Sequence, residues 1–144
     1  MKKSLKDSES GTSAIEFAIL APVFVLLVLG LIDFGRYMYY SIVAAHAARA
    51  GVQYGAQNVY SAADTAGMQN AASADAPGGF LPVATHYCSL NGSAAMCGTG
   101  TPAAGNTYYV KVVVTGVFNP IISYPGIPHS MTISSTAQMR VAAQ

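Results

Sequence analysis

The longest apolar stretch of the chain lies near its beginning. Residues 17–32, FAILAPVFVLLVLGLI, contain no charged side chain. At about 1.5 Å per residue they cover roughly 24 Å of helix, whereas the hydrocarbon core of a bilayer is about 30 Å thick. The run becomes long enough over residues 12–34, with Glu16 and Asp33 close to its two edges. We therefore predict a single transmembrane helix over residues 12–34.

The residues that follow are typical of a helix leaving a membrane. Asp33 and Arg36 are three positions apart, so their side chains share a helix face and can form an ion pair. The aromatic belt expected at a membrane surface is supplied by Tyr37, Tyr39 and Tyr40. No proline interrupts the alanine-rich sequence up to residue 57. We predict that the helix continues outside the membrane over residues 35–58.

One face of this extension carries small residues. They recur at helical spacing at Ala44, Ala47, Ala48, Gly51 and Gly55. A face of this kind lets another backbone approach closely. Two partners are open at this point, namely the sheet of the same chain and the helices of sibling subunits in a filament.

Residues 59–144 predict a small α+β domain on the far side of the membrane. Ser61 and Asp64 resemble a capping box at the start of a short helix over residues 62–74. The following Ala-Pro-Gly-Gly sequence ends that helix.

Three later segments have strand character, and they cover residues 80–87, 108–118 and 131–139. Pro82 lacks the N–H group that a sheet needs, which either weakens the first strand or confines it to an edge. In the third strand we expect four side chains to point inward: Met131, Ile133, Ala137 and Met139. The predicted fold class is therefore α+β, in which the long transmembrane helix continues outside the membrane and packs on a small antiparallel sheet of about three strands.

The connection between the second and third strands contains three prolines and must loop. Its apolar side chains are Ile121, Ile122, Tyr124 and Ile127. They either pack on the domain or form a docking surface for a partner.

The composition argues against several function classes. The chain is 52% hydrophobic and 9% charged, whereas soluble domains carry about 25% charged residues. A net charge of +1 without a basic cluster does not suit nucleic-acid binding. The three histidines are 40 and 43 residues apart, and no pair of carboxylates has a catalytic or metal-ligand spacing. We expect no enzyme activity, no metal, no cofactor and no small-molecule substrate.

Cys88 and Cys97 are the two cysteines of the chain, with eight residues between them. Paired, they would close a short loop and stabilise the fold by about 2.5–3 kcal/mol in the chain-entropy model. A disulfide needs an oxidising compartment, which places the C-terminal domain outside the cytoplasm. The three lysines before the apolar run and the two arginines soon after it agree with a cytoplasmic N-terminus. Two unrelated thiols are the alternative.

The most specific signal lies where the polar leader meets the apolar helix. Residues 11–17, GTSAIEF, place Glu16 five positions after Gly11 and next to Phe17. A glutamate inside a membrane is costly unless it has a partner or lies among the head groups. The string resembles the processing site of type IV pilin-like proteins of the Flp (tight-adherence) branch. In that branch a prepilin peptidase cuts after a glycine five residues before Glu-Tyr or Glu-Phe.

The sequence beyond this site resembles the TadE-like family. The family carries an acidic-Phe-Gly-Arg step after its membrane span and an Ala-Arg-x-Gly stretch further along. Here these are the residues DFGR at 33–36 and ARAG at 48–51. Residues 131–143 are similar to the last strand of that family.

This resemblance implies that a prepilin peptidase cuts between Gly11 and Thr12 and removes residues 1–11. The product would hold four basic and four acidic residues. In a filament, Glu16 of one subunit would then neutralise the Thr12 ammonium of its neighbour, because either charge alone is costly in an apolar core. Glu16 and Phe17 would thus be assembly residues. The size of the domain after the helix favours a minor pilin or pseudopilin over the main fibre subunit.

The expected function is that of a TadE-like minor pilin or pseudopilin, which serves an Flp-type pilus or its secretion machinery. The protein would cross the bacterial inner membrane once, with its N-terminus in the cytoplasm. Its expected partners are membrane lipid, the prepilin peptidase, other pilin-like subunits and the pilus assembly machinery. The alternative is an uncleaved, single-pass, membrane-anchored binding module that presents its sheet to a partner outside the membrane.

Overall fold

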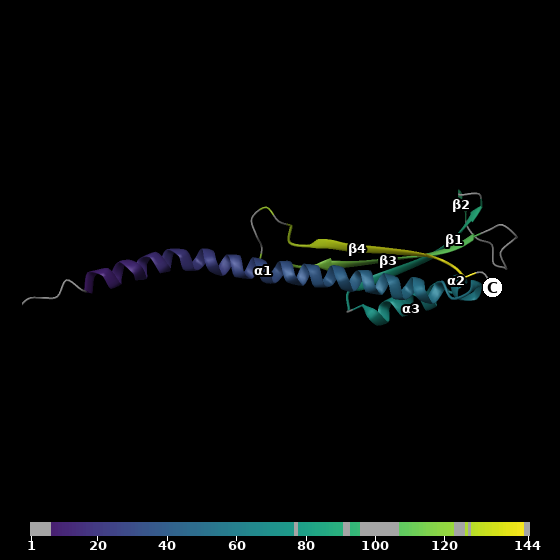
Figure 1. Cartoon of the computed structure of the whole chain (residues 1–144), viewed down its shortest axis with the longest axis horizontal. Helices are drawn as coiled ribbons and strands as arrows, with labels where there is room; N and C mark the ends of the chain where they lie inside the picture. The colour runs from purple at the N-terminus through teal and green to yellow at the C-terminus, as the bar shows by residue number, and fades with distance from the viewer. Residues whose placement is uncertain are drawn as a thin grey trace, which may run out of the picture.

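The first element of the protein is one long helix, α1, which runs over Asp7–Gly55. The computed structural model describes residues 7–76, 78–90, 93–95, 107–122, 126 and 128–142. The remaining elements lie along the C-terminal half of α1, whereas its N-terminal half projects alone (Figure 1). The predicted continuation of the apolar helix into a domain is therefore confirmed.

Two short helices follow, α2 over Val59–Ala63 and α3 over Thr65–Asp75. The side chain of Asn58 accepts a hydrogen bond from the Ser61 N–H and caps α2. Asp64 accepts one from the Gly67 N–H and caps α3. The predicted capping box at Ser61 is wrong. Asn58 is itself a strong N-cap residue, and with this cap the helix begins about one turn earlier than predicted. Ser61 therefore lies inside α2.

The sheet has four strands in the described residues, in the order β2-β1-β3-β4, and every neighbouring pair is antiparallel. Their bounds are Phe80–Leu90 for β1, Ser93–Ala95 for β2, Thr107–Phe118 for β3 and Met131–Arg140 for β4. The three predicted strands are the three long ones. The short β2 pairs with β1 only at Cys88–Leu90. Pro82 therefore lies where β1 pairs with β3 alone, at the expected edge.

The inner strand β3 and the edge strand β4 are buried unequally. In β3 every second residue from Tyr108 to Phe118 is buried. In β4, Ile133 is buried, but Met139 is 39% exposed, which corrects its predicted inward position. Met139 pairs with Val110, which lies beside Gly55 at the last residue of α1. Because α1 ends there, it does not extend over Met139 of the edge strand, and this side chain stays partly exposed.

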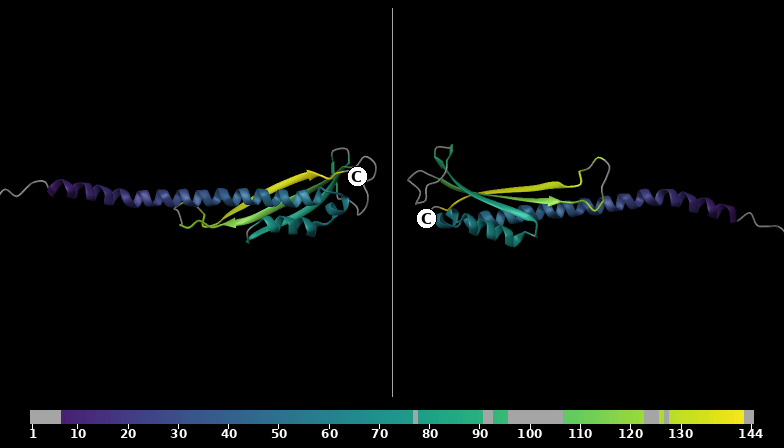
Figure 2. Two further views of the ribbon diagram at one scale, coloured as in Figure 1. Left: turned by 60° about the horizontal axis from the view of Figure 1, so that its bottom comes forward. Right: turned by 180° about the vertical axis from the view of Figure 1, so that it is seen from behind.

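The core lies between the sheet and the C-terminal half of α1. This helix contacts β3 and β4, and α3 lies beside it against β1 (Figure 2). The buried side chains come from all three parts: Ala44, Ala47, Ala48 and Val52 of α1, Met68 and Ala72 of α3, and Val110, Val112 and Val114 of β3.

The small-residue face of α1 is occupied within the chain. A Cβ atom on Gly51 would lie 2.9 Å from the Met68 carbonyl oxygen and 3.1 Å from Cγ2 of Val112. One on Gly55 would lie 3.1 Å from Cγ1 of Val110 and would clash with Met68. The close approach of α3 and β3 therefore uses the surface that glycine leaves open.

Candidate functional site

The N-terminal half of α1 has no cover from the rest of the described chain. No residue between Gly11 and Ile32 is buried. Large apolar side chains such as Phe17 and Phe24 expose 74% and 67% of their surface. Among the described residues, α1 is the one helix long and apolar enough to cross a membrane. Such a surface requires lipid or other protein around it.

The predicted processing residues lie on the exposed first turns of α1. A Cβ atom on Gly11 would meet nothing within 4 Å, so packing does not require a glycine there. The bond after Gly11 lies inside the helix. Glycine lowers helix stability by about 1 kcal/mol relative to alanine, so the helix is locally weaker at this bond.

Glu16 and Phe17 lie one turn further along the same exposed surface. The Glu16 carboxylate makes no ion pair or hydrogen bond with another described residue. Among the described residues the fold leaves this side chain exposed.

Asp33 is the buried charged residue of the described structure, with 6% of its surface exposed. Its Oδ1 atom accepts a hydrogen bond from Nη1 of Arg36 at 2.9 Å, which confirms the predicted ion pair. Both carboxylate oxygens also accept the N–H of Ile121, at 3.1 and 3.0 Å. The Arg36 guanidinium lies 5.4 Å from the centre of the Phe118 ring. Asp33 therefore anchors the connection between β3 and β4 to the helix.

Two of the three tyrosines predicted to form an aromatic belt point toward the sheet instead. The rings of Tyr37 and Tyr40 meet Phe118 at centroid distances of 5.6 and 6.0 Å, both edge to face. Tyr40 also stacks on Phe80 at 5.9 Å. Tyr39 alone of the three is strongly exposed, at 61%. Tyr37 and Tyr40 thus join α1 to the domain, and Tyr39 retains the predicted outward position.

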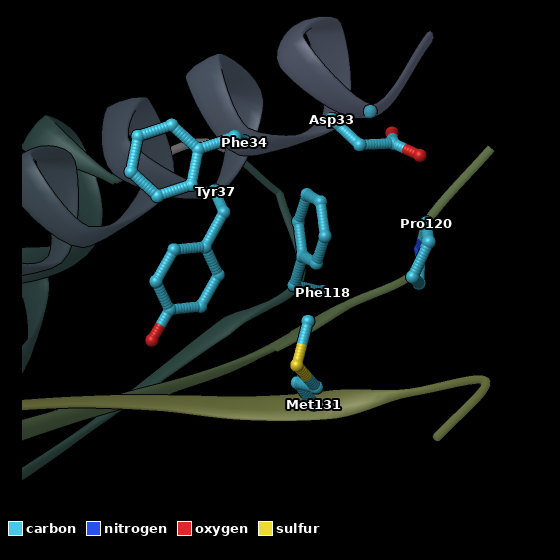
Figure 3. Close-up of a pocket in the computed structure, with 7 residues that line it drawn as sticks. Asp33, Phe34, Tyr37, Phe118, Pro120 and Met131 are labelled. Atoms are coloured by element: carbon cyan, nitrogen blue, oxygen red, sulfur yellow. The ribbon is translucent and has the colours of Figure 1, made fainter. Parts of the chain in front are cut away.

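A pocket of about 440 Å³ lies between α1 and the end of the sheet nearest to the bare helix. Figure 3 shows Asp33, Phe34 and Tyr37 on α1, opposite Phe118 of β3, Pro120 of the connection and Met131 of β4. The lining is formed by Gly30, Asp33, Phe34, Tyr37, Phe118, Pro120 and Met131. The one charged group in it, Asp33, is already paired. The chemistry of the pocket suits hydrocarbon better than a polar substrate.

A second polar joint lies at the other end of the domain. The Tyr54 hydroxyl donates a hydrogen bond to Oδ2 of Asp64 at 2.9 Å, and the Gly67 N–H donates one to Oδ1 at 2.9 Å. The Gly67 N–H and the Tyr54 hydroxyl hold the pKa of Asp64 below its usual value. The same hydrogen bond and the negative charge of Asp64 raise the pKa of Tyr54. This joint fixes the end of α1 to the start of α3.

Several predicted site residues lie outside the described residues. Cys97, Tyr124 and Ile127 are among them. Cys88 is buried on β1, and its pairing with Cys97 stays a prediction. In the described part of the chain no group of three or more His, Cys, Asp or Glu side chains could hold a metal ion.

Sequence reasoning missed the buried hydrogen bond between Asp33 and the connection that contains Ile121. The two residues are 88 positions apart, and a backbone N–H carries no sequence signal. The one available hint was an ionisable residue at the edge of an apolar run.

Comparison with known proteins found a family match for the N-terminal part of the chain. The model of the family described as TadE-like protein matches residues 11–53. The match begins at Gly11 and includes Glu16, Asp33 and Arg36, and so confirms the predicted resemblance over this segment. No curated protein and no solved structure matched the chain.

Proposed function

We propose that this chain, with its TadE-like segment over residues 11–53, is a minor pilin or pseudopilin of an Flp-type (tight-adherence) pilus or its secretion machinery. The observation that carries the proposal is the division of α1 into two halves. Its C-terminal half forms the core of a domain, and its N-terminal half is apolar and uncovered. A subunit of this kind needs a helix that lipid surrounds before assembly and that neighbouring helices surround afterwards.

The exposed carboxylate of Glu16 supports the proposal. Cleavage after Gly11 would create a new ammonium group on Thr12, one helical turn before Glu16. In an apolar filament core, each of these charges is costly alone and is stabilised by pairing with the opposite charge of a neighbour. Such pairing would favour one axial offset between subunits. Glu16 would then act as an assembly residue, with Phe17 packing beside it.

The proposed location is the inner membrane, with the leader in the cytoplasm and the domain outside it. The apolar helix is compatible with a single-pass anchor. In this scheme the partners are lipid, a prepilin peptidase, other pilin-like subunits and the assembly machinery. The role is structural, and no reaction is assigned to the chain.

The test is the intact mass of the protein purified from membranes, with and without a co-expressed Flp-type prepilin peptidase. Loss of residues 1–11 with the peptidase, leaving Thr12 as the N-terminus, is the expected result. The substitution Gly11→Leu should block this loss. Gly35→Leu is the matched control, because Gly35 is also an exposed helical glycine at which an added Cβ atom would meet nothing within 4 Å, and it should leave processing intact.

Assembly is tested separately with Glu16→Gln, which removes the charge and keeps the size of the side chain. This variant should be processed normally and recovered from membranes but not with the pilus fraction. Full-length protein in every sample, beside a control pilin that is cut, would contradict the proposal. The chain would then be a permanent single-pass anchor for a binding module.

A further inference from the structure

We propose that the connection after β3, residues 119–122, is a second membrane contact, with Ile121 inserted among the lipids next to α1. The inference goes beyond the proposed pilin function. It requires only that α1 spans the membrane, and it would hold equally for an uncleaved anchor.

The depth of Ile121 follows from its hydrogen bond to Asp33. Thr12 and Asp33 are 21 residues apart, which is about 32 Å along a helix, and a bilayer hydrocarbon core is about 30 Å thick. With Thr12, the first residue of the predicted span, at the inner boundary of the hydrocarbon core, Asp33 therefore lies at its outer boundary. The Ile121 N–H is 3.0–3.1 Å from the Asp33 oxygens, so its backbone lies at the same level. The polar layer beyond the core is roughly 5–7 Å thick on each side, and Ile121 lies within it.

The surface at this level is apolar and continuous with that of the helix. Ile121 exposes 57% of its surface, and Leu31 and Phe34 of α1 expose 63% and 60%. Residues 119–122 include no charged side chain. Lipid surrounds a single spanning helix on all sides, so a segment held against its flank at this depth must contact lipid.

The pocket beside this segment has the same character. It lies between Gly30 of the apolar run and Pro120 of the connection, and its volume of about 440 Å³ suits a stretch of hydrocarbon chain. Its charged group, Asp33, is satisfied by Arg36 and by the Ile121 N–H. No unpaired charge of the lining therefore opposes the entry of lipid.

The absence of tryptophan from the sequence gives a direct experiment. The full-length variant Ile121→Trp, in phospholipid vesicles without peptidase or other pilus proteins, carries a single tryptophan, which is excited at wavelengths that the nine tyrosines do not absorb. We expect lipids brominated near the glycerol end of their chains to quench its emission more than lipids brominated near the methyl end. Asn119→Trp serves as a second reporter if Ile121→Trp does not fold, because Asn119 is exposed in the same segment.

Two control variants define the scale. Phe24→Trp, at a 67% exposed position in the middle of the apolar run, should be quenched most by bromine near the methyl end. Tyr60→Trp, at an 85% exposed position on α2 at the far end of α1, should not be quenched. Emission from the 121 or 119 reporter that is as insensitive to bromine as that of Tyr60→Trp overturns the proposal. Blue-shifted, bromine-insensitive emission that is lost on dilution with lipid also overturns it, because a second copy of the chain would then cover the segment.

Discussion

Replacing Asp33 with alanine should release the connection between β3 and β4 from the helix. The substitution removes the acceptor of the Ile121 N–H and the partner of Arg36 in one step. The site is closed to water on the Asp33 side, where 6% of the residue is exposed. Without this acceptor, the segment around Ile121 should open far more often than in the parent protein and expose the Ile121 N–H to solvent.

The magnitude follows from the two contacts. A hydrogen bond to a charged group contributes about 1.5–3 kcal/mol. The Arg36 side chain is 39% exposed and can be solvated by water, so the ion pair adds at most about 1 kcal/mol. We therefore expect Asp33→Ala to cost about 2–4 kcal/mol in local opening free energy. Asp33→Asn keeps a neutral acceptor and should cost about half as much.

Amide hydrogen exchange of the peptide that contains Ile121 measures this cost directly. At 1.4 kcal/mol per tenfold change, Asp33→Ala should raise the exchange rate by roughly 30- to 700-fold. Asp75→Ala is the matched control, because Asp75 is an exposed aspartate at the end of α3 and its loss should change stability by less than about 0.5 kcal/mol. An Ile121 amide that exchanges equally fast in the parent, Asp33→Ala and Asp75→Ala proteins would refute the anchor.

Two further predictions concern the packing of α1 in the domain. Gly51→Ala forces a Cβ atom to within 2.9 Å of the Met68 carbonyl oxygen and should destabilise the domain by about 1–3 kcal/mol in thermal unfolding. At Gly35 the added Cβ atom would meet nothing within 4 Å, so Gly35→Ala should stabilise the helix by up to about 1 kcal/mol. Equal effects of the two would contradict the close approach of α3. Because the pKa of Asp64 is lowered in the fold, its contribution to stability is present above its usual pKa and is lost as the pH falls through the folded-state pKa. The pKa of Tyr54 is raised in the fold, so its contribution to stability is present below its usual pKa and is lost as the pH rises through the folded-state pKa. Melting temperatures of Tyr54→Phe measured against pH should lack this loss at alkaline pH.

The elements that the sequence predicts well are those whose pattern of apolar residues extends over many positions. The apolar run and its alanine-rich continuation predict a helix over residues 12–58, and α1 covers Asp7–Gly55. The alternation over residues 108–118 predicts β3, because burial on one side imposes the same spacing on the sequence. The short β2 was not predicted, since three residues of strand carry no usable period. The start of α2 was not predicted either, because its cap is Asn58 and the predicted capping box began at Ser61.

The candidate site divides in the same way. Gly11 and Glu16 are close together in sequence, and the family match over residues 11–53 confirms the resemblance that they carry, whereas the roles of the two residues stay predictions. The direction of Tyr37 and Tyr40 could not be predicted, because a tyrosine beside a membrane suits either a belt or a packed interface, and only the position of Phe118 decides between them. The hydrogen bond between Asp33 and Ile121 depends on how two distant segments meet, which local patterns do not encode.

The occupied small-residue face has a consequence for assembly. A sibling helix would have to displace α3 and β3 from Gly51, where the Met68 carbonyl oxygen is already 2.9 Å from a Cβ position. Residues 11–32, in contrast, present a surface on which no residue is buried. If the subunit joins a filament, its helix contacts should therefore come from this bare segment, and Asp33 marks where they end. Substitutions on the small-residue face should then lower domain stability, whereas Glu16 and the apolar residues around it should affect incorporation alone.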